Sequence, residues 1–444
     1  MKNLKLTYIL WLIAVGITSC GSEESKDARP NIIYIMVDDM GYSDLSSYGR
    51  SDYQTPVIDA FVNEGMKFSQ AYAAAAICTP TRVGLMTGRY PARNEVGLRE
   101  PLSLVDSIGL SPEIETLSSL IKNSGYETAI FGKWHLGSRL EHSPLLHGFD
   151  QFFGISAGAA DYIDHKYFSD QPILYENDKL VEKEGYLTDL ITDYTVNFIK
   201  KKHDKPFFIN LEYNAPHWPW QLPGDDPYPY GETWADFQAG GTPEIYAGMV
   251  KNLDTNIGRV LKAIQDSGLD ESTIIIFTSD NGGEKFSDMG PFQGRKGNLY
   301  EGGIRVPAAV RWPGKIKAGT TSNQAAITMD WTVTMLDLAN VEIPIGVSFD
   351  GISLVEYLKG NVPVIPRKFF WRIGRKGSEN LQNAYRNGDW KYLKTSEGEF
   401  LFDLKNDLGE GTNLRDDNIK KFNQLKNDFE ALDNQMLNRL VADE

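Results

Sequence analysis

Cysteine and positive charge are both scarce in this chain. Only Cys20 and Cys78 occur among 444 residues, so at most one disulfide could form, and only in an exported protein. The 45 Lys and Arg residues are outnumbered by 60 Asp and Glu, which leaves a formal net charge of −15. We therefore expect no nucleic acid partner, because phosphates require an excess of basic side chains. An anionic ligand would need positive charge concentrated in one cleft.

The sequence also shows no internal repeat and no low-complexity stretch, and the apolar run at its N-terminus is too short to span a membrane. That run, residues 6–15, follows two lysines, a pattern typical of an export signal. It ends in Ile-Thr-Ser before Cys20, which resembles the bacterial lipobox. We expect residues 1–19 to be removed as a lipoprotein signal peptide, Cys20 to carry a lipid anchor, and residues 20–29 to form a tether.

Lipid attachment at Cys20 would make the protein an exported, membrane-anchored lipoprotein, either periplasmic or on the outer-membrane surface. A plain cleaved signal peptide with an incidental Cys20 is the alternative. If Cys20 does carry lipid, Cys78 is left as a single thiol in an oxidising compartment.

The remaining composition, with 41% hydrophobic and 24% charged residues, is that of a globular protein. Apolar β-branched runs alternate with amphipathic segments, which predicts an α/β fold with a large, mostly parallel sheet flanked by helices on both faces. From about residue 360 the pattern changes to short strands and one charged helix. We predict an α/β domain over 30–359 and a small C-terminal α+β subdomain, an antiparallel sheet with one helix, over 360–444.

Cys78 lies in the stretch that carries the most chemistry, Ala75 to Gly88. A proline and an arginine follow it closely, and the apolar run after them is closed by Gly88. Thr79 is expected to cap a helix with Pro80 in its first position, which would put Cys78 at the helix mouth. Because the helix dipole and free N–H groups favour negative charge there, the position suits a nucleophile or an anion. A buried structural thiol is the alternative.

Two adjacent carboxylates, Asp38 and Asp39, follow the apolar run 31–37. This run is expected to be a central strand buried on both faces. Carboxylates side by side at its end repel each other unless something positive lies between them, and a hard divalent cation with oxygen ligands is the usual solution. A helix cap at Asp39 with a solvated Asp38 is the alternative for an isolated pair.

Polar side chains follow three other expected strands. Lys133 and His135 bracket a tryptophan between two glycines, an arrangement that anion binding explains better than core packing. His217 lies in a proline-stiffened loop after the next strand, and Asp280 follows the last one. Because ligands bind at the C-terminal edge of open α/β sheets, we expect these side chains to share one rim.

The loop after His217 is rich in aromatic residues. Two tryptophans adjoin the histidine, and Tyr228, Tyr230 and Trp234 follow. Aromatic faces of this kind commonly stack on sugar rings. Ordinary loop packing explains the last three almost equally well.

These segments together resemble the type I, formylglycine-dependent sulfatases of the alkaline phosphatase superfamily, and within them the bacterial polysaccharide sulfatases. Cys78-Thr79-Pro80-Thr81-Arg82 matches the family's C-x-P-x-R signature, and the other blocks occur in the family's order. Those blocks are 31–39, 132–137, 216–217, 278–282 and 296–307. The resemblance covers about residues 30 to 415, and it implies the family's fold and hydrolysis of sulfate esters.

The resemblance implies that a formylglycine-generating maturase oxidises Cys78 to formylglycine (3-oxoalanine), whose hydrated aldehyde is the nucleophile. A thiolate sulfated on sulfur has no easy release step, whereas a sulfated diol expels sulfate by re-forming the aldehyde. Arg82 and Lys133 would brace the diol. Lys296 and His217 would contact the sulfate and the bridging oxygen, and one of them would protonate the leaving alcohol.

One Ca²⁺ ion is implied by the same resemblance. Its ligands would be Asp38, Asp39, Cys78, Asp280 and Asn281. Asp280 would also be the base for the attacking hydroxyl. His135 would accept the proton of the second hydroxyl as sulfate leaves.

The expected function is therefore a sulfatase acting on a sulfated oligo- or polysaccharide, such as an algal chain of the ulvan or carrageenan type, or a glycosaminoglycan. Residues 154–165 resemble members of the family that act on sulfated sugars. A phosphonate or phosphate ester hydrolase of the same superfamily is one alternative. A non-catalytic glycan-binding lipoprotein, in which Cys78 is never oxidised, is the other.

Overall fold

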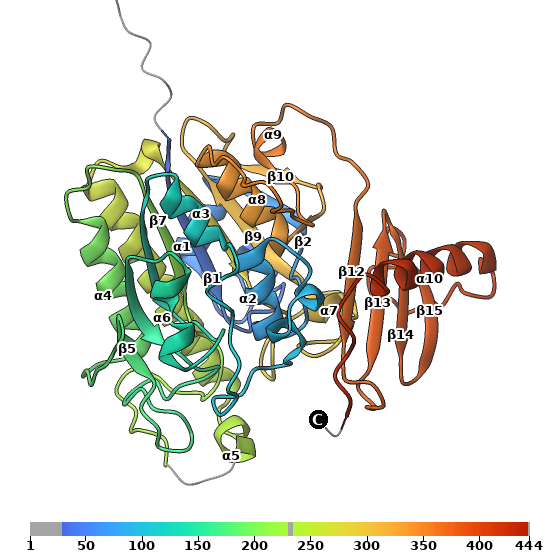
Figure 1. Cartoon of the computed structure of the whole chain (residues 1–444), viewed down its shortest axis with the longest axis horizontal. Helices are drawn as coiled ribbons and strands as arrows, with labels where there is room; N and C mark the ends of the chain where they lie inside the picture. The colour runs from blue at the N-terminus through green and yellow to red at the C-terminus, as the bar shows by residue number, and fades with distance from the viewer. Residues whose placement is uncertain (1–28, 230–233, 443–444) are drawn as a thin grey trace, which may run out of the picture.

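The computed structural model of the chain describes residues 29–229 and 234–442. A large sheet with its helices occupies most of the molecule, and a small sheet lies beside it, drawn in orange to red in Figure 1. The expected signal peptide 1–19 and the expected lipid at Cys20 fall outside the described residues, as does the tether apart from Arg29. Across the described ranges, no helix combines the length and apolar character that a membrane span requires.

The centre of the large sheet is parallel. β1 (Asn31–Val37) lies between β7 (Phe207–Glu212) and β8 (Thr273–Ser279), and β3 (Glu127–Gly132) and β4 (Gln151–Ile155) follow beyond β7, all in the same direction. Every residue of β1, β7 and β8 is buried, as expected of apolar strands covered on both faces. The predicted parallel core of an α/β fold is confirmed.

Towards its edges the sheet turns antiparallel. β9 (Arg305–Arg311) runs antiparallel to both β8 and β2 (Met66–Tyr72). The remaining strands are β10 (Thr320–Ser322) and β11 (Ala326–Ile327), parallel to β2, and β5 (Leu174–Glu176) and β6 (Lys179–Leu180), antiparallel beyond β4. The order is β10-β2-β9-β8-β1-β7-β3-β4-β5-β6, with β11 beside β2.

The sequence pattern does not predict β2, β4 or β9. It predicts a loop over 147–162, which is wrong because β4 lies within this range. Over 290–307 it predicts only a glycine-rich segment, although β9 starts at Arg305. In β4 the glycine has a structural reason: a Cβ on Gly154 would lie 1.8 Å from the carbonyl oxygen of Gly132 in β3. In β2 the register shifts between Phe68 and Ala71, which breaks the alternation that marks a strand.

Helices cover both faces of the large sheet, as predicted. Ile33 and Ile35 of β1 pack in one core with α1, α4 and α6, whereas Ile32 and Tyr34 pack in the other with α2, α3, α8 and α9. The bounds are α1 (Pro56–Asn63), α2 (Cys78–Thr87), α3 (Leu117–Asn123), α4 (Leu187–Ile199), α6 (Pro243–Asp266), α8 (Thr328–Leu338) and α9 (Val355–Leu358). Two short helices, α5 (Trp234–Ala239) and α7 (Glu301–Ile304), lie in the connections.

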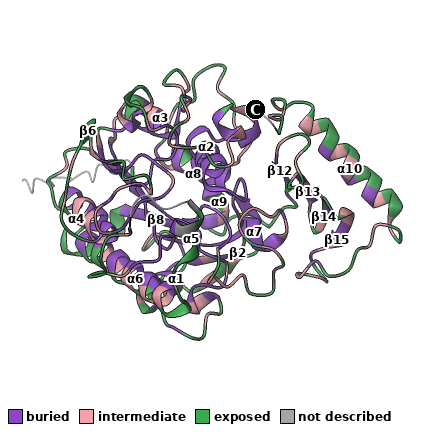
Figure 2. Ribbon diagram, turned by 90° about the horizontal axis from the view of Figure 1, so that it is seen from below, coloured by how far each residue is buried: buried purple, intermediate pink, exposed green. Residues whose placement is uncertain are grey.

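The small sheet is antiparallel and is backed by one helix, also as predicted. Its elements are β12 (Lys368–Ile373), β13 (Gln382–Asn387), β14 (Trp390–Thr395), β15 (Gly398–Asp403) and α10 (Ile419–Asp433), whose outer side is exposed in Figure 2. The sequence predicts α10 to continue to Leu440, which is wrong. The chain instead turns back, so that the N–H of Leu437 donates to the carbonyl of Ala92 at 3.0 Å.

The two sheets share buried contacts close to the start of α2. Tyr392 of β14 and Cys78 belong to the same apolar cluster. The fully buried Lys391 ammonium lies 3.0 Å from a carboxylate oxygen of Glu301 and 2.8 Å from one of Glu410. The small sheet therefore packs behind the helix that carries the cysteine. The domain boundary expected at residue 360 stays a prediction.

Candidate active site

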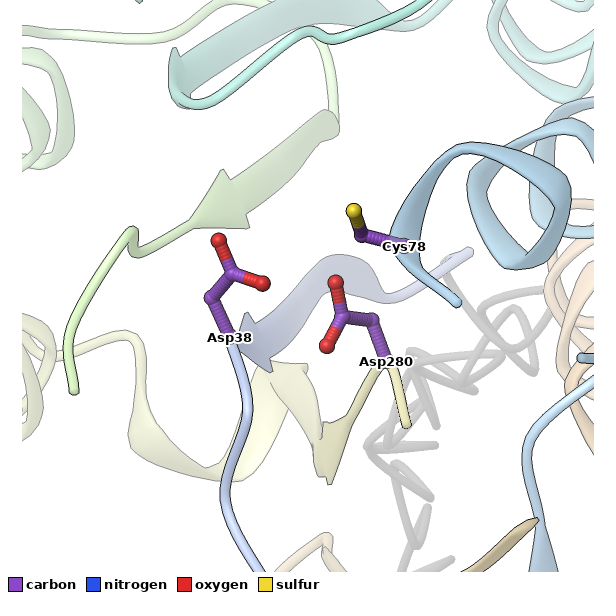
Figure 3. A group of neighbouring side chains, drawn as sticks. All are labelled: Asp38, Cys78 and Asp280. Atoms are coloured by element: carbon purple, nitrogen blue, oxygen red, sulfur yellow. The ribbon is translucent and has the colours of Figure 1, made fainter. Parts of the chain in front are cut away.

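Four central strands deliver polar residues to one rim of the large sheet. β1 ends before Asp38, β3 before Lys133 and β8 before Asp280, while the loop after β7 carries His217. Figure 3 shows the carboxylates of Asp38 and Asp280 facing the thiol of Cys78 across this rim. One carboxylate oxygen of each aspartate and the sulfur of Cys78 all lie within 4.8 Å of one another. The grouping predicted from the strand ends is what the parallel sheet produces.

Cys78 is the first residue of α2, so the predicted helix start is two residues late. Ile77 is the N-terminal flanking residue, with extended backbone, and Thr79 does not cap the helix. The Thr79 hydroxyl instead accepts the backbone N–H of Leu102 at 3.1 Å. The predicted end is correct, because Gly88 adopts a left-handed conformation with φ of 64°. Cys78 is nevertheless at the helix mouth, 1% exposed, and burial raises the pKa of its thiol.

Asp38 and Asp280 form the centre of the charged floor. The Lys133 ammonium donates to Asp38 Oδ2 at 2.5 Å, whereas Asp38 Oδ1 is buried without a hydrogen-bond partner. Asp280 Oδ2 accepts from the Arg82 guanidinium at 3.0 Å. Burial raises the pKa of Asp280 to about 7, and the carboxylate of Asp38 adds to the rise. Two crowded, buried carboxylates of this kind call for additional positive charge.

Asp39 is the meeting point of three other predicted residues. Its Oδ2 accepts from the Lys296 ammonium at 2.7 Å and lies 3.5 Å from His217 Nε2. Its Oδ1 accepts from the Asn281 amide at 2.7 Å. Burial by itself raises the pKa of Asp39, but Lys296 and His217 outweigh burial and lower it to about 2. Asp39 has a positive φ of 62°, a strained backbone that turns the second carboxylate back into the site.

The donor set at the floor fits a hard divalent cation. Asp38, Asp39 and Asp280 contribute carboxylate oxygens, and Asn281 adds an amide oxygen, the ligand types that Ca²⁺ and Mg²⁺ prefer. Two of these atoms, Asp38 Oδ1 and Asn281 Oδ1, are buried and have no partner among the described residues. Burial of unpaired acceptors is costly, and a cation would satisfy both.

The two histidines are held by backbone carbonyls. His217 Nδ1 lies 2.6 Å from the carbonyl oxygen of Trp218, which fixes the ring and leaves Nε2 facing the floor. Burial lowers the pKa of His217 to about 3, although Asp39 opposes the shift. His135 Nε2 lies 2.9 Å from the carbonyl oxygen of Leu102, and its Nδ1 is buried without a partner. Burial and then Lys133 hold the pKa of His135 well below its usual range.

These groups open into a pocket of about 370 Å³. Its floor is formed by Cys78, His135, His217 and Lys296, and its walls by Pro101, Leu102, Ser103, Gly158, Tyr167, Phe168 and Trp218. Trp220, in contrast, packs on Tyr246 and Phe286 in the core, so ordinary packing accounts for it. Tyr230 lies outside the described residues.

Glu212 is a functional candidate that the sequence does not single out. It ends the buried strand β7 and is 2% exposed, and its Oε2 accepts from the Arg82 guanidinium at 2.7 Å. Arg82 therefore bridges Glu212 and Asp280 beside Cys78. Burial raises the pKa of Glu212 to about 7, although Arg82 opposes the shift. The signal in the sequence that could have identified Glu212 is a carboxylate as the last residue of a largely apolar strand.

Replacement of Glu212 by glutamine is expected to lower kcat about 10- to 100-fold with little change in KM, because Arg82 loses the charge that aligns it. Steady-state kinetics and the melting temperature measure the effect. Glu64→Gln is the matched control, since Glu64 also pairs with an arginine, Arg311, at 2.8 Å but is mostly exposed. An unchanged kcat in folded Glu212→Gln would remove Glu212 from the site.

Comparison with known protein families gives two matches. The sequence profile of the sulfatase family matches residues 30–341, and the C-terminal profile of N-sulphoglucosamine sulphohydrolase matches residues 289–435. The two overlap over residues 289–341, the last part of the chain that contributes strands to the large sheet, and together they span residues 30–435.

Individual relatives agree with those matches. The N-acetylgalactosamine-6-sulfatase of Rattus norvegicus is 32% identical over 87% of this chain and 75% of its own length. The arylsulfatase of Hemicentrotus pulcherrimus is 32% identical over 82% of this chain and 67% of its own length. Among solved structures, Ps i-CgsB in complex with k-i-k-neocarrahexaose superposes with a TM-score of 0.82 at 30% identity, over 91% of this chain and 93% of that one.

Proposed function

Because the chain belongs to the sulfatase family and is thus a sulfuric ester hydrolase, we propose that it removes sulfate from a sulfated carbohydrate. The observation that carries the proposal is the floor of the pocket. There, Cys78 at a helix mouth faces the buried carboxylates of Asp38 and Asp280, with Asp39 beside them, and the basic side chains of Lys133, Lys296 and Arg82 reach these carboxylates from separate elements. Such an arrangement of preorganised charge suits transfer of an anionic group.

We propose that the working nucleophile is formylglycine made from Cys78 by a maturase. The hydrated aldehyde supplies two hydroxyls, one to attack sulfur and one to expel sulfate as the aldehyde re-forms. The buried thiol itself is poorly suited, because burial raises its pKa and so disfavours the thiolate. Arg82 and Lys133 lie beside residue 78, where their charges would brace the two hydroxyls.

We propose that one divalent cation, Ca²⁺, is held by Asp38, Asp39, Asp280 and Asn281 together with the side chain of residue 78. Bound there, it would offset negative charge on the nucleophile and on a sulfate oxygen. The unpartnered oxygens of Asp38 and Asn281 support this assignment. Asp280, crowded against Asp38, is suited to accept the proton of the attacking hydroxyl.

The remaining proton transfers are assigned to the groups that line the pocket. His217 and Lys296 are both within reach of Asp39 and face the pocket, so one of them would donate a proton to the leaving alcohol. His135 lies across the pocket floor with Nδ1 unpartnered, and it would take the proton of the second hydroxyl. Its low pKa keeps the ring neutral and able to accept.

A carbohydrate substrate is supported by the pocket walls, where Tyr167, Phe168 and Trp218 present ring surface of the kind that packs on pyranose rings. It is also supported by the carrageenan oligosaccharide bound by Ps i-CgsB and by the N-acetylgalactosamine-6-sulfatases among the relatives. Within that class we propose an algal polysaccharide fragment of the carrageenan or ulvan type, or a glycosaminoglycan fragment.

A phosphonate or phosphate ester hydrolase would use a similar site, and an assay separates the two. The purified protein is expected to hydrolyse an aryl sulfate with kcat/KM about tenfold or more above that for the matching aryl phosphate diester or phosphonate monoester. Release of sulfate from a panel of sulfated oligosaccharides then tests the carbohydrate class. A kcat/KM for the phosphate diester or phosphonate monoester above that for the aryl sulfate would overturn the proposal.

We further propose that the protein is an exported lipoprotein anchored through Cys20. The described chain starts at Arg29, beside the N-terminal end of β1 (Figure 1). Asp38, at the floor of the site, follows the opposite end of that strand. An anchor at Cys20 would thus leave the pocket pointing away from the membrane. Fatty-acid labelling that persists in Cys20→Ala would contradict the anchor.

A further inference from the structure

The described walls of the pocket above the charged floor carry no basic side chain. Among the described residues, the basic groups that line it are Lys296, His135 and His217, all at the floor, while the walls are formed by uncharged side chains from 101–103, 158, 167–168 and 218.

The floor cations already have partners. The Lys296 ammonium lies 2.7 Å from Asp39 Oδ2, and the Lys133 ammonium lies 2.5 Å from Asp38 Oδ2. The floor therefore has little positive charge to spare beyond what the reacting sulfate itself needs. A second anionic group on the same sugar ring would find no counter-charge in the walls.

Charges just outside the walls do not change this balance. The carboxylate of Asp106 accepts the backbone N–H of Ser103 at 2.7 Å, which puts negative charge at the rim. Arg295 is exposed and adjoins Lys296 in the chain, but it does not line the pocket. Its charge acts instead on Glu284. Burial raises the pKa of Glu284, and Arg295 helps to oppose that rise.

The walls offer ring surface in place of charge. Tyr167 and Phe168 lie with ring centroids 4.5 Å apart, and Phe237 packs at 6.3 Å from Phe168 and 6.1 Å from Trp218. This aromatic wall joins two loops that are far apart in sequence. Such a surface suits the C–H faces of an uncharged pyranose, and burying an unpaired sulfate or carboxylate against it would be costly.

We propose that the sugar residue bearing the scissile sulfate carries no second negative charge: it is a neutral hexose or N-acetylhexosamine with a single sulfate ester, and disulfated and uronate residues are excluded. This inference rests on the proposed function and adds the charge class of the sugar at the pocket. The aromatic wall and the rim at Ser103 are its specificity determinants.

The test compares matched substrates in the full-length protein. Monosulfated galactose and N-acetylgalactosamine isomers are assayed against analogues that keep the same sulfate and add a second sulfate or a carboxylate on that ring. We expect kcat/KM to fall about tenfold or more for each added charge. Equal or faster turnover of the doubly charged analogues would overturn the inference while leaving the sulfatase proposal intact.

A charge substitution at the rim provides the second arm. Ser103→Lys should lower the ratio of kcat/KM for the singly charged substrate to that for the doubly charged one by about threefold or more, because it supplies the missing cation. Ser272→Lys is the control, since Ser272 is exposed beside the start of β8, at the opposite end of that strand, and should leave the ratio unchanged. An unchanged ratio in Ser103→Lys would count against the charge argument. Turnover of an aryl sulfate but of no sulfated sugar would overturn the carbohydrate proposal and this inference together.

Discussion

The Cys78→Ala protein is expected to fold normally and to lose essentially all sulfatase activity, with kcat lower by about 10⁴-fold or more. The sulfur of residue 78 lies within 4.8 Å of carboxylate oxygens of Asp38 and Asp280, and alanine can be neither oxidised to an aldehyde nor hydrated. Because the change removes a single sulfur atom from a buried position, the melting temperature should shift by about 4 °C at most. Turnover of an aryl sulfate and thermal unfolding measure the two effects.

Val83→Ala provides the matched control for that loss. Val83 lies in the same helix, α2, and is fully buried, but it packs in the apolar core away from the floor. Its truncation should lower the free energy of unfolding by about 2 kcal/mol and leave kcat nearly unchanged. Substantial activity in Cys78→Ala would rule out residue 78 as the nucleophile. A comparable loss in Val83→Ala would mean that the loss in Cys78→Ala comes from packing and not from chemistry.

The second large effect is expected from the cation site. After chelation and dialysis, added Ca²⁺ should raise the melting temperature of the wild-type protein and restore its activity. A saturating ion at about 100 times its dissociation constant stabilises by about 2.7 kcal/mol. In Asp280→Asn, added Ca²⁺ should no longer raise the melting temperature. The kcat of this variant should fall by about 10³-fold, since a carboxylate ligand and the proposed base disappear together.

Asp254→Asn is the control for the cation experiment. Asp254 is also a buried aspartate, but its carboxylate accepts the backbone N–H groups of Val57 and Ile58 at the start of α1. Its replacement should lower stability and leave the calcium response intact. A full calcium shift in Asp280→Asn, or none in the wild-type protein, would contradict the assignment of the floor as a cation site.

The sequence predicted which polar residues meet at one rim better than it predicted the full set of strands in the sheet. Strands such as β1 and β8 are unbroken apolar runs, and the polar residues directly after them needed only the parallel direction to meet at one rim. Asp38, Asp39, Asp280 and Asn281 come together in this way, and Cys78 meets Asp38 and Asp280 from the start of α2. The strands β2 and β9 escaped detection because β2 contains a register shift and β9 begins inside a glycine-rich segment.

The missed details share one physical reason, which is that tertiary contacts override local preference. Thr79 has the side chain of a helix cap, yet its hydroxyl is used by Leu102, and α2 starts at Cys78. Glu212 is the charged last residue of the largely apolar strand β7, yet it is the buried partner of Arg82. A partner 130 positions away in the chain leaves no periodic signal in the sequence.

The measurement that tests the central claim most directly is a mass spectrum of the peptide containing residue 78, from protein made in its native host. The account predicts the mass of formylglycine at that position, as the free aldehyde or its hydrate, together with reaction of the aldehyde with a hydrazide probe. An unmodified cysteine in material that hydrolyses sulfate esters would contradict the proposed nucleophile.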